Sequence, residues 1–516
     1  MDNSQSGQPP FAQQTQHIPP FQHVPPPGFQ PPADPVFGQP PAPRRGHGRT
    51  VLLVAIGLAV VLVLGFIAGT IASGGSNALS QNAANQLTAP DGADESGQPP
   101  APSSPAAAPG GGSGSDLRKG AVFIQSNAAT GNEVAAFSRA SNGKLREVGR
   151  YRTGGNGSGS FEDTAHGIVL GTPFGESSPQ QNLDGAQLLF VTNAGSNSVS
   201  VFRVNADSLE LVTHQPSGGE KPISLAVSNG MLYVLNSGEL DDRFVLRFPD
   251  VMLDNCAHGD QPSVTGFRIS QEGSLKPIPN SRRTLSGNQK SGCAQISFTP
   301  DGRRLIATER LASLAGREPD RGAIVTFDMA SNGTPGAKRV QDTAGVGPFG
   351  FAFTKDGTLL VTEQNRAEPG KGTMSSYTVL GDGTLKPVSK AVPNQQADTC
   401  WVVPTADGRT AFASNALGEG TISSYSIDDT GALKLLRASA TTSGDDDDDH
   451  LQSGTFDVGL SRDSRYLYAV NGHFGTLQAF EVKEGGSLEF IENHKVFNVV
   501  LPEVGGQLPP FGIAVY

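Results

Sequence analysis

The sequence predicts an all-β fold, a seven-bladed β-propeller that a C-terminal strand closes. Three observations predict it. A β-hairpin phrase occurs seven times, a short apolar run precedes six of these hairpins, and the end of the chain supplies a seventh apolar run. Repetition of a four-stranded unit at this spacing is typical of propeller blades.

The clearest copy of the hairpin phrase is LLFVTNAGSNSVSVF, Leu188–Phe202. Apolar and β-branched residues predict the two strands, and the Asn, Gly and Ser between them favour a tight turn. Each copy ends in an aromatic residue, and consecutive aromatics stand 48 to 65 residues apart. These aromatics are Phe137, Phe202, Phe267, Phe327, Tyr377, Tyr425 and Phe480.

The apolar runs predict the innermost strand of each blade, because a short strand that is apolar throughout is buried on both faces. The first hairpin, 122–137, has no such run before it, whereas PFGIAVY at 510–516 nearly repeats PFGFAF at 348–353. We therefore expect the C-terminus to pair beside 122–126 and to close the ring, which removes the open sheet edges. The six runs that precede their hairpins are 166–170, 222–227, 293–298, 348–353, 400–404 and 455–460.

The chain before the propeller divides into three parts by composition. Residues 1–48 are rich in Pro and Gln and predict a disordered cytoplasmic tail. Residues 49–72 predict a transmembrane helix, and 73–115, rich in Ala, Pro, Gly and Ser, predict a flexible linker. The propeller is expected over 116–516.

The expected membrane span is Val51–Ile71, which carries no charged residue. As a helix it would measure roughly 31 Å, about the thickness of a bilayer core. Arg44, Arg45 and Arg49 precede it, so the positive-inside rule predicts a single-pass protein with an extracytoplasmic propeller. A cleaved signal peptide is the alternative, with Thr70-Ile-Ala72 as a weak cleavage site.

The net charge, the cysteines and one acidic run bear on the partners, disulfides and metals that can be expected. The formal net charge of −11 argues against nucleic acid as a partner. Of the three cysteines, Cys256 and Cys293 flank a long insertion and form the expected disulfide, which leaves Cys400 as a thiol. The run Asp445–Asp449 could hold Ca²⁺ but fits an exposed acidic loop better, and no metal or cofactor is expected.

The candidate site residues come from strand ends. In an antiparallel blade the start of the inner strand and the end of the second strand share one edge, and seven blades bring these edges to one mouth of the channel. His166 opens an expected inner strand and could act as a general base, or simply cap the core. Glu309, followed by Arg310, and Glu363 end second strands where the other blades carry turn-forming Asn.

The hairpin phrase, SFTPDGRRLIATER and FGFAFTKDG resemble the lactonase family of seven-bladed propellers, which includes bacterial 6-phosphogluconolactonase and fungal carboxymuconate cycloisomerase. The resemblance implies that His166 matches a family His and Glu309 a family Glu. The family's Arg-His pair falls on Ala294-Gln295 and is missing, so Arg310 or Arg282 would have to replace the cation. A phosphorylated lactone needs a cation near its phosphate, so 6-phosphogluconolactone is disfavoured.

Two functions are therefore expected from the sequence. The first is a membrane-tethered, extracytoplasmic lactonase-like hydrolase, in which His166, Glu309, Arg310 and Glu363 act on a lactone or related ester at the channel mouth. Its ligand would be a small lactone or sugar-like molecule, and the propeller would be monomeric. The alternative is a non-catalytic propeller that binds a cell-envelope or protein partner, because fold alone does not fix function.

Overall fold

A computed structural model of the protein describes its propeller region. Among the described residues no helix is long and apolar enough to cross a membrane. The expected tail, transmembrane helix and linker, and the run Asp445–Asp449, lie outside the described residues. The described residues are 116–159, 165–176, 187–238, 261–288, 291–418, 420–441, 454–472, 474–498 and 512–516.

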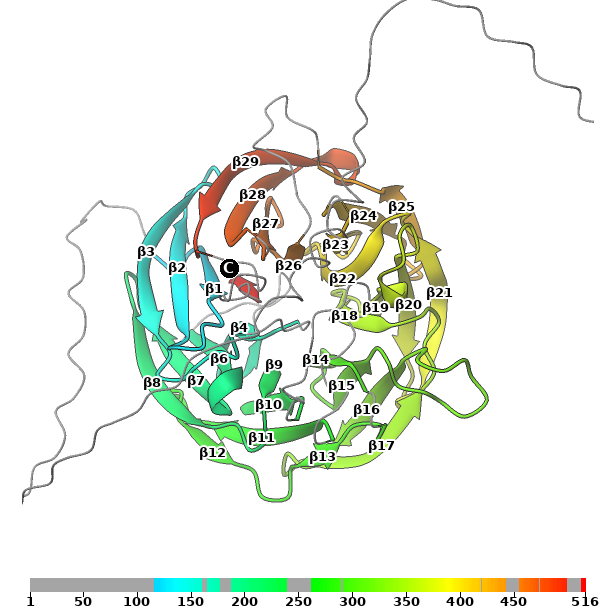
Figure 1. The fold of residues 1–516 in the computed structure, drawn as a ribbon, viewed down its shortest axis with the longest axis horizontal. Coiled ribbons are helices and arrows are strands. Elements are labelled where there is room, and N and C mark those ends of the chain that lie inside the picture. The colour runs from blue at the N-terminus through cyan, green and yellow to red at the C-terminus, as the bar shows by residue number, and fades with distance from the viewer. Residues whose placement is uncertain are drawn as a thin grey trace, which may run out of the picture. The chain divides into compact units, whose positions relative to one another are not determined.

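Seven antiparallel four-stranded blades surround a central axis, as the sequence predicted (Figure 1). A short extra strand, β5 (Gly175–Glu176), pairs with the inner strands of blades 2 and 3 and joins those blades into one sheet. The seven innermost strands are β30 (Ile513–Val515), β4 (Ile168–Thr172), β9 (Pro222–Ser228), β14 (Cys293–Phe298), β18 (Pro348–Phe353), β22 (Ala397–Pro404) and β26 (Thr455–Leu460).

The second and third strands of each blade form the predicted hairpins. The second strands are β1 (Ala121–Gln125), β6 (Leu188–Asn193), β10 (Met231–Asn236), β15 (Arg304–Glu309), β19 (Thr358–Glu363), β23 (Thr410–Leu417) and β27 (Tyr466–Asn471). The third strands are β2 (Glu133–Arg139), β7 (Ser198–Val204), β11 (Ser263–Ile269), β16 (Ala323–Met329), β20 (Thr373–Val379), β24 (Ile422–Ile427) and β28 (Thr476–Val482).

The fourth strands form the outer wall in Figure 1, and three short 3₁₀ helices lie in those connections that the structure describes. The outer strands are β3 (Leu145–Arg152), β8 (Leu209–Pro216), β12 (Leu275–Pro277), β17 (Pro335–Gln341), β21 (Leu385–Pro393), β25 (Leu433–Arg437) and β29 (Leu488–Lys495), with β13 (Arg283–Thr284) beside β11. The 3₁₀ helices are η1 (Ala194–Ser196), η3 (Asn365–Ala367) and η4 (Glu484–Gly486).

The C-terminal strand closes the ring as predicted. β30 pairs antiparallel with β1, with Val515 opposite Val122 and Ile513 opposite Ile124. Ala121 and Tyr516 extend this ladder by exchanging backbone hydrogen bonds of 3.1 and 2.9 Å. Blade 1 therefore combines the first and last described strands of the chain.

The apolar core lies between adjacent blades. All seven repeat aromatics are buried, and each lies on a third strand opposite a residue of the neighbouring second strand. Phe327 of blade 4, for example, packs in one cluster with Tyr233 and Leu285 of blade 3. Burying a side chain of this size contributes about 2–3 kcal/mol, so the repeated aromatic is a main stabilising contact between blades.

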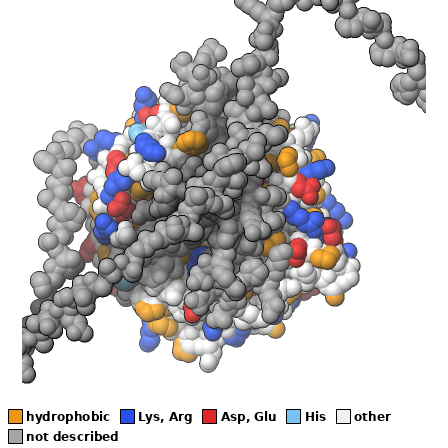
Figure 2. All heavy atoms as spheres, viewed as in Figure 1, with side chains coloured by type: hydrophobic (Ala, Val, Ile, Leu, Met, Phe, Trp, Pro, Cys, Tyr) orange, Lys and Arg blue, Asp and Glu red, His pale blue; other side chains and the backbone are white. Residues whose placement is uncertain are grey.

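The surface carries charges of both signs. Figure 2 shows Lys and Arg side chains mixed with Asp and Glu along the rim of this face. Ion pairs such as Arg304–Asp328 and Arg203–Glu210, both at 2.8 Å, join neighbouring strands within a blade. Exposed pairs of this kind each contribute about 1 kcal/mol or less.

The cysteines follow the sequence expectation as far as they are described. Cys293 is disulfide-bonded, and its expected partner Cys256 lies outside the described residues. Cys400 keeps its thiol, is buried, and donates a hydrogen bond of 3.3 Å to Asp398 Oδ1.

Candidate functional site

A cavity of about 380 Å³ lies on the propeller axis. Side chains from all seven inner strands or the residues beside them line it. Most of the lining residues are apolar, although polar atoms contribute about half of the exposed wall. His166, Gln295 and Asp457 are among the polar residues, and Lys355 follows the end of β18. A largely apolar, concave space with a few convergent polar groups is the usual form of a small-molecule site.

A repeated β-bulge brings several of these side chains to the axis. In β14, Cys293 pairs with Glu309 and Ile296 with Ala307, so Ala294 and Gln295 together face the single residue Thr308. Such a bulge bends the strand and re-aims its side chains. The same register shift occurs in β18, β22 and β26, at 349–350, 400–401 and 456–457.

Side chains at the bulge position also brace neighbouring blades. Gln295 Oε1 accepts the backbone N–H of Phe351 at 2.9 Å, and Asp457 Oδ2 accepts that of Ile513 at 3.2 Å. Ser224 Oγ, in blade 3, accepts the N–H of Ile296 at 3.1 Å. In each case the acceptor lies on one inner strand and the donor on the inner strand of the next blade around the ring.

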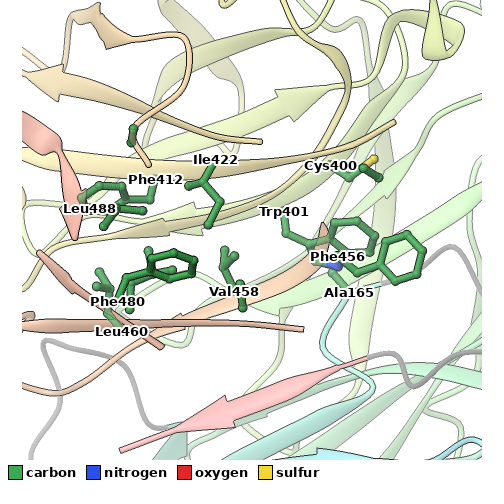
Figure 3. Close-up of a cluster of buried hydrophobic side chains, with 14 of the residues drawn as sticks. Ala165, Cys400, Trp401, Phe412, Ile422, Phe456, Val458, Leu460, Phe480 and Leu488 are labelled. Atoms are coloured by element: carbon green, nitrogen blue, oxygen red, sulfur yellow. The ribbon is translucent and has the colours of Figure 1, made fainter. Parts of the chain in front are cut away.

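The aromatic side of the cavity is formed by Trp401, which lies between two phenylalanines. Its ring centroid is 5.1 Å from Phe349 and 5.4 Å from Phe456. Ala165 packs into the same cluster, next to Trp401 and Phe456 (Figure 3). Ala165 N–H also donates to the Ala294 carbonyl at 3.2 Å, so the chain before β4 reaches blade 4.

His166 lines the cavity, but it does not open a strand as the sequence suggested. It lies two residues before β4, with a φ of +63° that makes a turn into the strand. Its carbonyl accepts the N–H of Leu225 at 2.9 Å, which ties this turn to blade 3. Because of this φ value, the direction of the His166 side chain does not follow the in-and-out alternation of the strand. Sequence periodicity cannot predict such a departure.

The imidazole of His166 is neutral at pH 7. Gln295 Nε2 lies 3.4 Å from its Nδ1 and 3.5 Å from its Nε2, and also donates to the Phe351 carbonyl at 2.8 Å. Burial in the channel lowers the pKa of His166 to about 4. An amide donor beside the ring acts in the same direction, because it favours the form of imidazole that has an acceptor nitrogen.

Asp457 is the titratable cavity residue that the sequence reading did not identify. Burial raises its pKa to about 7, although the N–H groups of Ile513 and Val458 both donate to its oxygens. It lies in TFDVGL, one of the short runs that predict a buried inner strand. An Asp inside a strand buried on both faces was the signal that could have found it, since unpaired charge is seldom buried.

Glu309 and Glu363 do not line the cavity. Glu309 accepts hydrogen bonds from Ser286 N and Oγ, both at 2.9 Å, and from Ser291 Oγ at 2.5 Å. Glu363 accepts from Gly345 N at 2.9 Å, Thr373 Oγ1 at 2.6 Å and Ser375 Oγ at 2.5 Å. Burial raises the pKa of both carboxyl groups, and the hydrogen bonds oppose it. Glu309 therefore joins its strand to the connection that precedes β14, and Glu363 joins its strand to a loop and to β20.

Arg310 is also buried away from the cavity wall. Its guanidinium carbon lies 5.8 Å from the centroid of the Phe349 ring. Of the four predicted site residues, the structure brings His166 to the axial cavity and gives Glu309, Arg310 and Glu363 other surroundings. The polar side chain beside the imidazole is that of Gln295.

Replacing Glu363 tests this assignment. Glu363→Ala leaves the Gly345 N–H and two hydroxyls without their acceptor, which should lower the free energy of unfolding by about 2–4 kcal/mol. Chemical denaturation measures the change, with Glu368→Ala as an exposed control expected within about 0.5 kcal/mol of the parent. Loss of a ligand-dependent activity with unchanged stability would instead support a role at the site.

Within the described ranges no group of three His, Cys, Asp or Glu side chains is arranged to hold an ion.

The fold and the axial cavity define a seven-bladed β-propeller with a space for a small molecule at its centre. Residues 261–395 match the family model described as "Lactonase, 7-bladed beta-propeller", so the resemblance predicted from the repeat phrases is confirmed. No protein of curated function matches the chain.

Solved structures agree with this fold. A candidate 6-phosphogluconolactonase from Bacteroides fragilis superposes with a TM-score of 0.52 at 16% identity, covering 77% of this chain and 98% of that one. A periplasmic gluconolactonase from Pseudomonas aeruginosa gives a TM-score of 0.53 at 13% identity, with coverage of 77% and 98%. At such identities the likeness concerns the fold alone.

Proposed function

We propose that the propeller binds a small lactone or related ester in the axial cavity and hydrolyses it. The observation that carries the proposal is that His166 and Asp457 both line the same cavity. Burial makes the first a neutral imidazole at pH 7 and the second a carboxyl group that titrates near pH 7. Opposite shifts in two such groups are typical of acid–base sites.

The chemistry would divide between the two side chains. Ionised Asp457 takes a proton from water as the water oxygen bonds to the ester carbonyl carbon, since a base works best with a pKa near the working pH. The carbonyl electron pair moves to its oxygen, and the N–H of neutral His166 donates to this oxyanion. When the ring C–O bond breaks, protonated Asp457 returns the proton to the leaving oxygen and a hydroxy acid is formed.

The substrate would be uncharged. Lys355 is the single Lys or Arg among the described residues that line the cavity, and its Nζ lies 2.7 Å from Asp356. Binding a phosphate in a cavity that also holds Asp457 would need a further cation, because like charges repel and desolvation costs are high. This agrees with the replacement of the family Arg-His pair by Ala294-Gln295.

A non-catalytic binding propeller is the second candidate. The observation that favours it is that Gln295 and Asp457 occupy their bulge positions as braces between blades, a role that needs no substrate. For either function, the uncharged stretch Val51–Ile71 after three arginines supports the proposal of a membrane tether with the propeller outside the cytoplasm.

Screening the protein against unphosphorylated and phosphorylated lactones tests the proposal. We expect hydrolysis of an unphosphorylated lactone, which the release of protons from the acid product measures. In His166→Ala, kcat/KM should fall by about 10²–10³-fold, the usual effect of losing one oxyanion donor. A hydrolysis rate that His166→Ala leaves intact would place the chemistry elsewhere. Binding of a lactone without any turnover would favour the binding propeller.

A further inference from the structure

A second cavity, of about 200 Å³, lies on blade 3, apart from the axial one. Gly219 and Glu220, before β9, form one side of it, and Asn236, Ser263 and Arg282 form the other. None of these residues lines the axial cavity. Its volume is below the range of roughly 300–1,000 Å³ that is usual for drug-sized ligands, so it suits a smaller molecule.

Two oxygens of residues that line this cavity are buried and accept no hydrogen bond from any described residue. Asn236 is 1% exposed, and its Nδ2 donates to Thr265 Oγ1 at 3.1 Å, which orients the amide and leaves Oδ1 without a partner. Glu220 Oε2 is likewise buried and without a partner. Each such acceptor costs free energy unless a donor binds it, so a native structure rarely keeps two in one pocket.

Arg282 supplies the opposite charge. It is exposed, and its Nε donates to Ser263 Oγ at 3.3 Å, which holds the guanidinium at the rim of the cavity. The two terminal nitrogens make no hydrogen bond with the described part of the chain. A guanidinium held in this way can bind a carboxylate through two parallel hydrogen bonds.

We propose that this cavity binds a small zwitterion of the α-amino acid class. The ligand's ammonium group donates to Asn236 Oδ1 and Glu220 Oε2 in the interior, and its carboxylate pairs with Arg282 at the rim. The cavity carries one negative and one positive side chain, which complements a ligand with one charge of each sign. A divalent cation fits less well, because Arg282 would repel it.

Titration calorimetry of the full chain with glycine, L-alanine and L-serine tests the proposal. We expect a dissociation constant in the millimolar range or tighter for at least one of them, and at least tenfold weaker binding of N-acetyl-L-alanine, which lacks the ammonium group. Arg282→Gln and Glu220→Gln should each weaken binding at least tenfold. Both changes lie outside the apolar core.

Arg283→Gln is the matched control. Arg283 is adjacent, does not line the cavity, and donates to the carbonyls of Asn280 and Arg282 at 2.9 and 2.8 Å. Its replacement should leave binding unchanged, and so should His166→Ala, so the result does not depend on lactone hydrolysis. Absence of binding at roughly 10 mM of all three amino acids would show that water alone fills the cavity. Equal binding of N-acetyl-L-alanine would show that the ammonium group is not recognised, and would overturn the proposal.

Discussion

Deleting Gly512–Tyr516 should unfold or aggregate the protein under conditions in which the full chain is folded. The deletion removes β30, and with it the ladder to β1, the two backbone bonds of Tyr516 and the buried side chains of Ile513 and Ala514. Together these contacts contribute roughly 5–10 kcal/mol. Since a domain's net stability is about 5–15 kcal/mol, little would remain.

The open ring would also expose the edge of β1, which is a template for pairing with other chains. Size-exclusion chromatography and thermal unfolding of the chain ending at residue 511 measure both effects. Tyr516→Ala is the control, because it keeps the ladder and removes the side chain alone, with its 3.2 Å contact to Arg462 and its packing at the edge of the core. A truncated chain that elutes as the full chain does, with an unchanged melting curve, would contradict the closure.

The closing strand could be predicted because its signal is local. PFGIAV repeats the inner-strand pattern of PFGFAF, and blade 1 lacked an inner strand before its hairpin. The hairpins were predictable for the same reason, since alternation, turn residues and the terminal aromatic belong to one stretch of chain in most blades. These features locate the blades and therefore the axis.

The site was harder to predict because its side chains are placed by departures from the repeat. A bulge turns Gln295 and Asp457 toward the axis, and a positive φ does the same for His166. Neither a bulge nor a left-handed turn at a histidine has a reliable sequence signal.

The two glutamates illustrate a second limit of sequence reasoning. Their predicted position, at the edge of the sheet where the inner strand begins, is correct, since Glu309 and Glu363 pair with the first residues of β14 and β18. Their partners, however, are hydroxyls and N–H groups of loops and strands whose positions depend on the tertiary fold. Strand position alone could not distinguish a buried link from a group at an open mouth.

Asp457→Asn should lower kcat for lactone hydrolysis by about 10²–10⁴-fold, because it removes the proposed general base. Asn resembles protonated Asp in shape, so the bond to Ile513 can be kept through its carbonyl oxygen. In the parent protein, kcat should rise with pH through about pH 7, as Asp457 ionises. Ser224→Ala is the control, because it removes a brace at the same bulge position in blade 3 without a titrating group.

The same variant has a second readout that needs no substrate. The folded-state pKa of Asp457, about 7, lies above the unfolded value of about 4, so the folded protein binds this proton more tightly. The stabilisation is fully present below about pH 4 and is lost as the pH rises through about 7. The asparagine in the Asp457→Asn variant does not ionise, so the melting temperature of the variant should rise relative to that of the parent as the pH increases from 5 to 8. Thermal unfolding at several pH values measures this difference. Parallel curves for the two proteins would show that Asp457 is already ionised at pH 5, and would remove it as a base that titrates near neutrality.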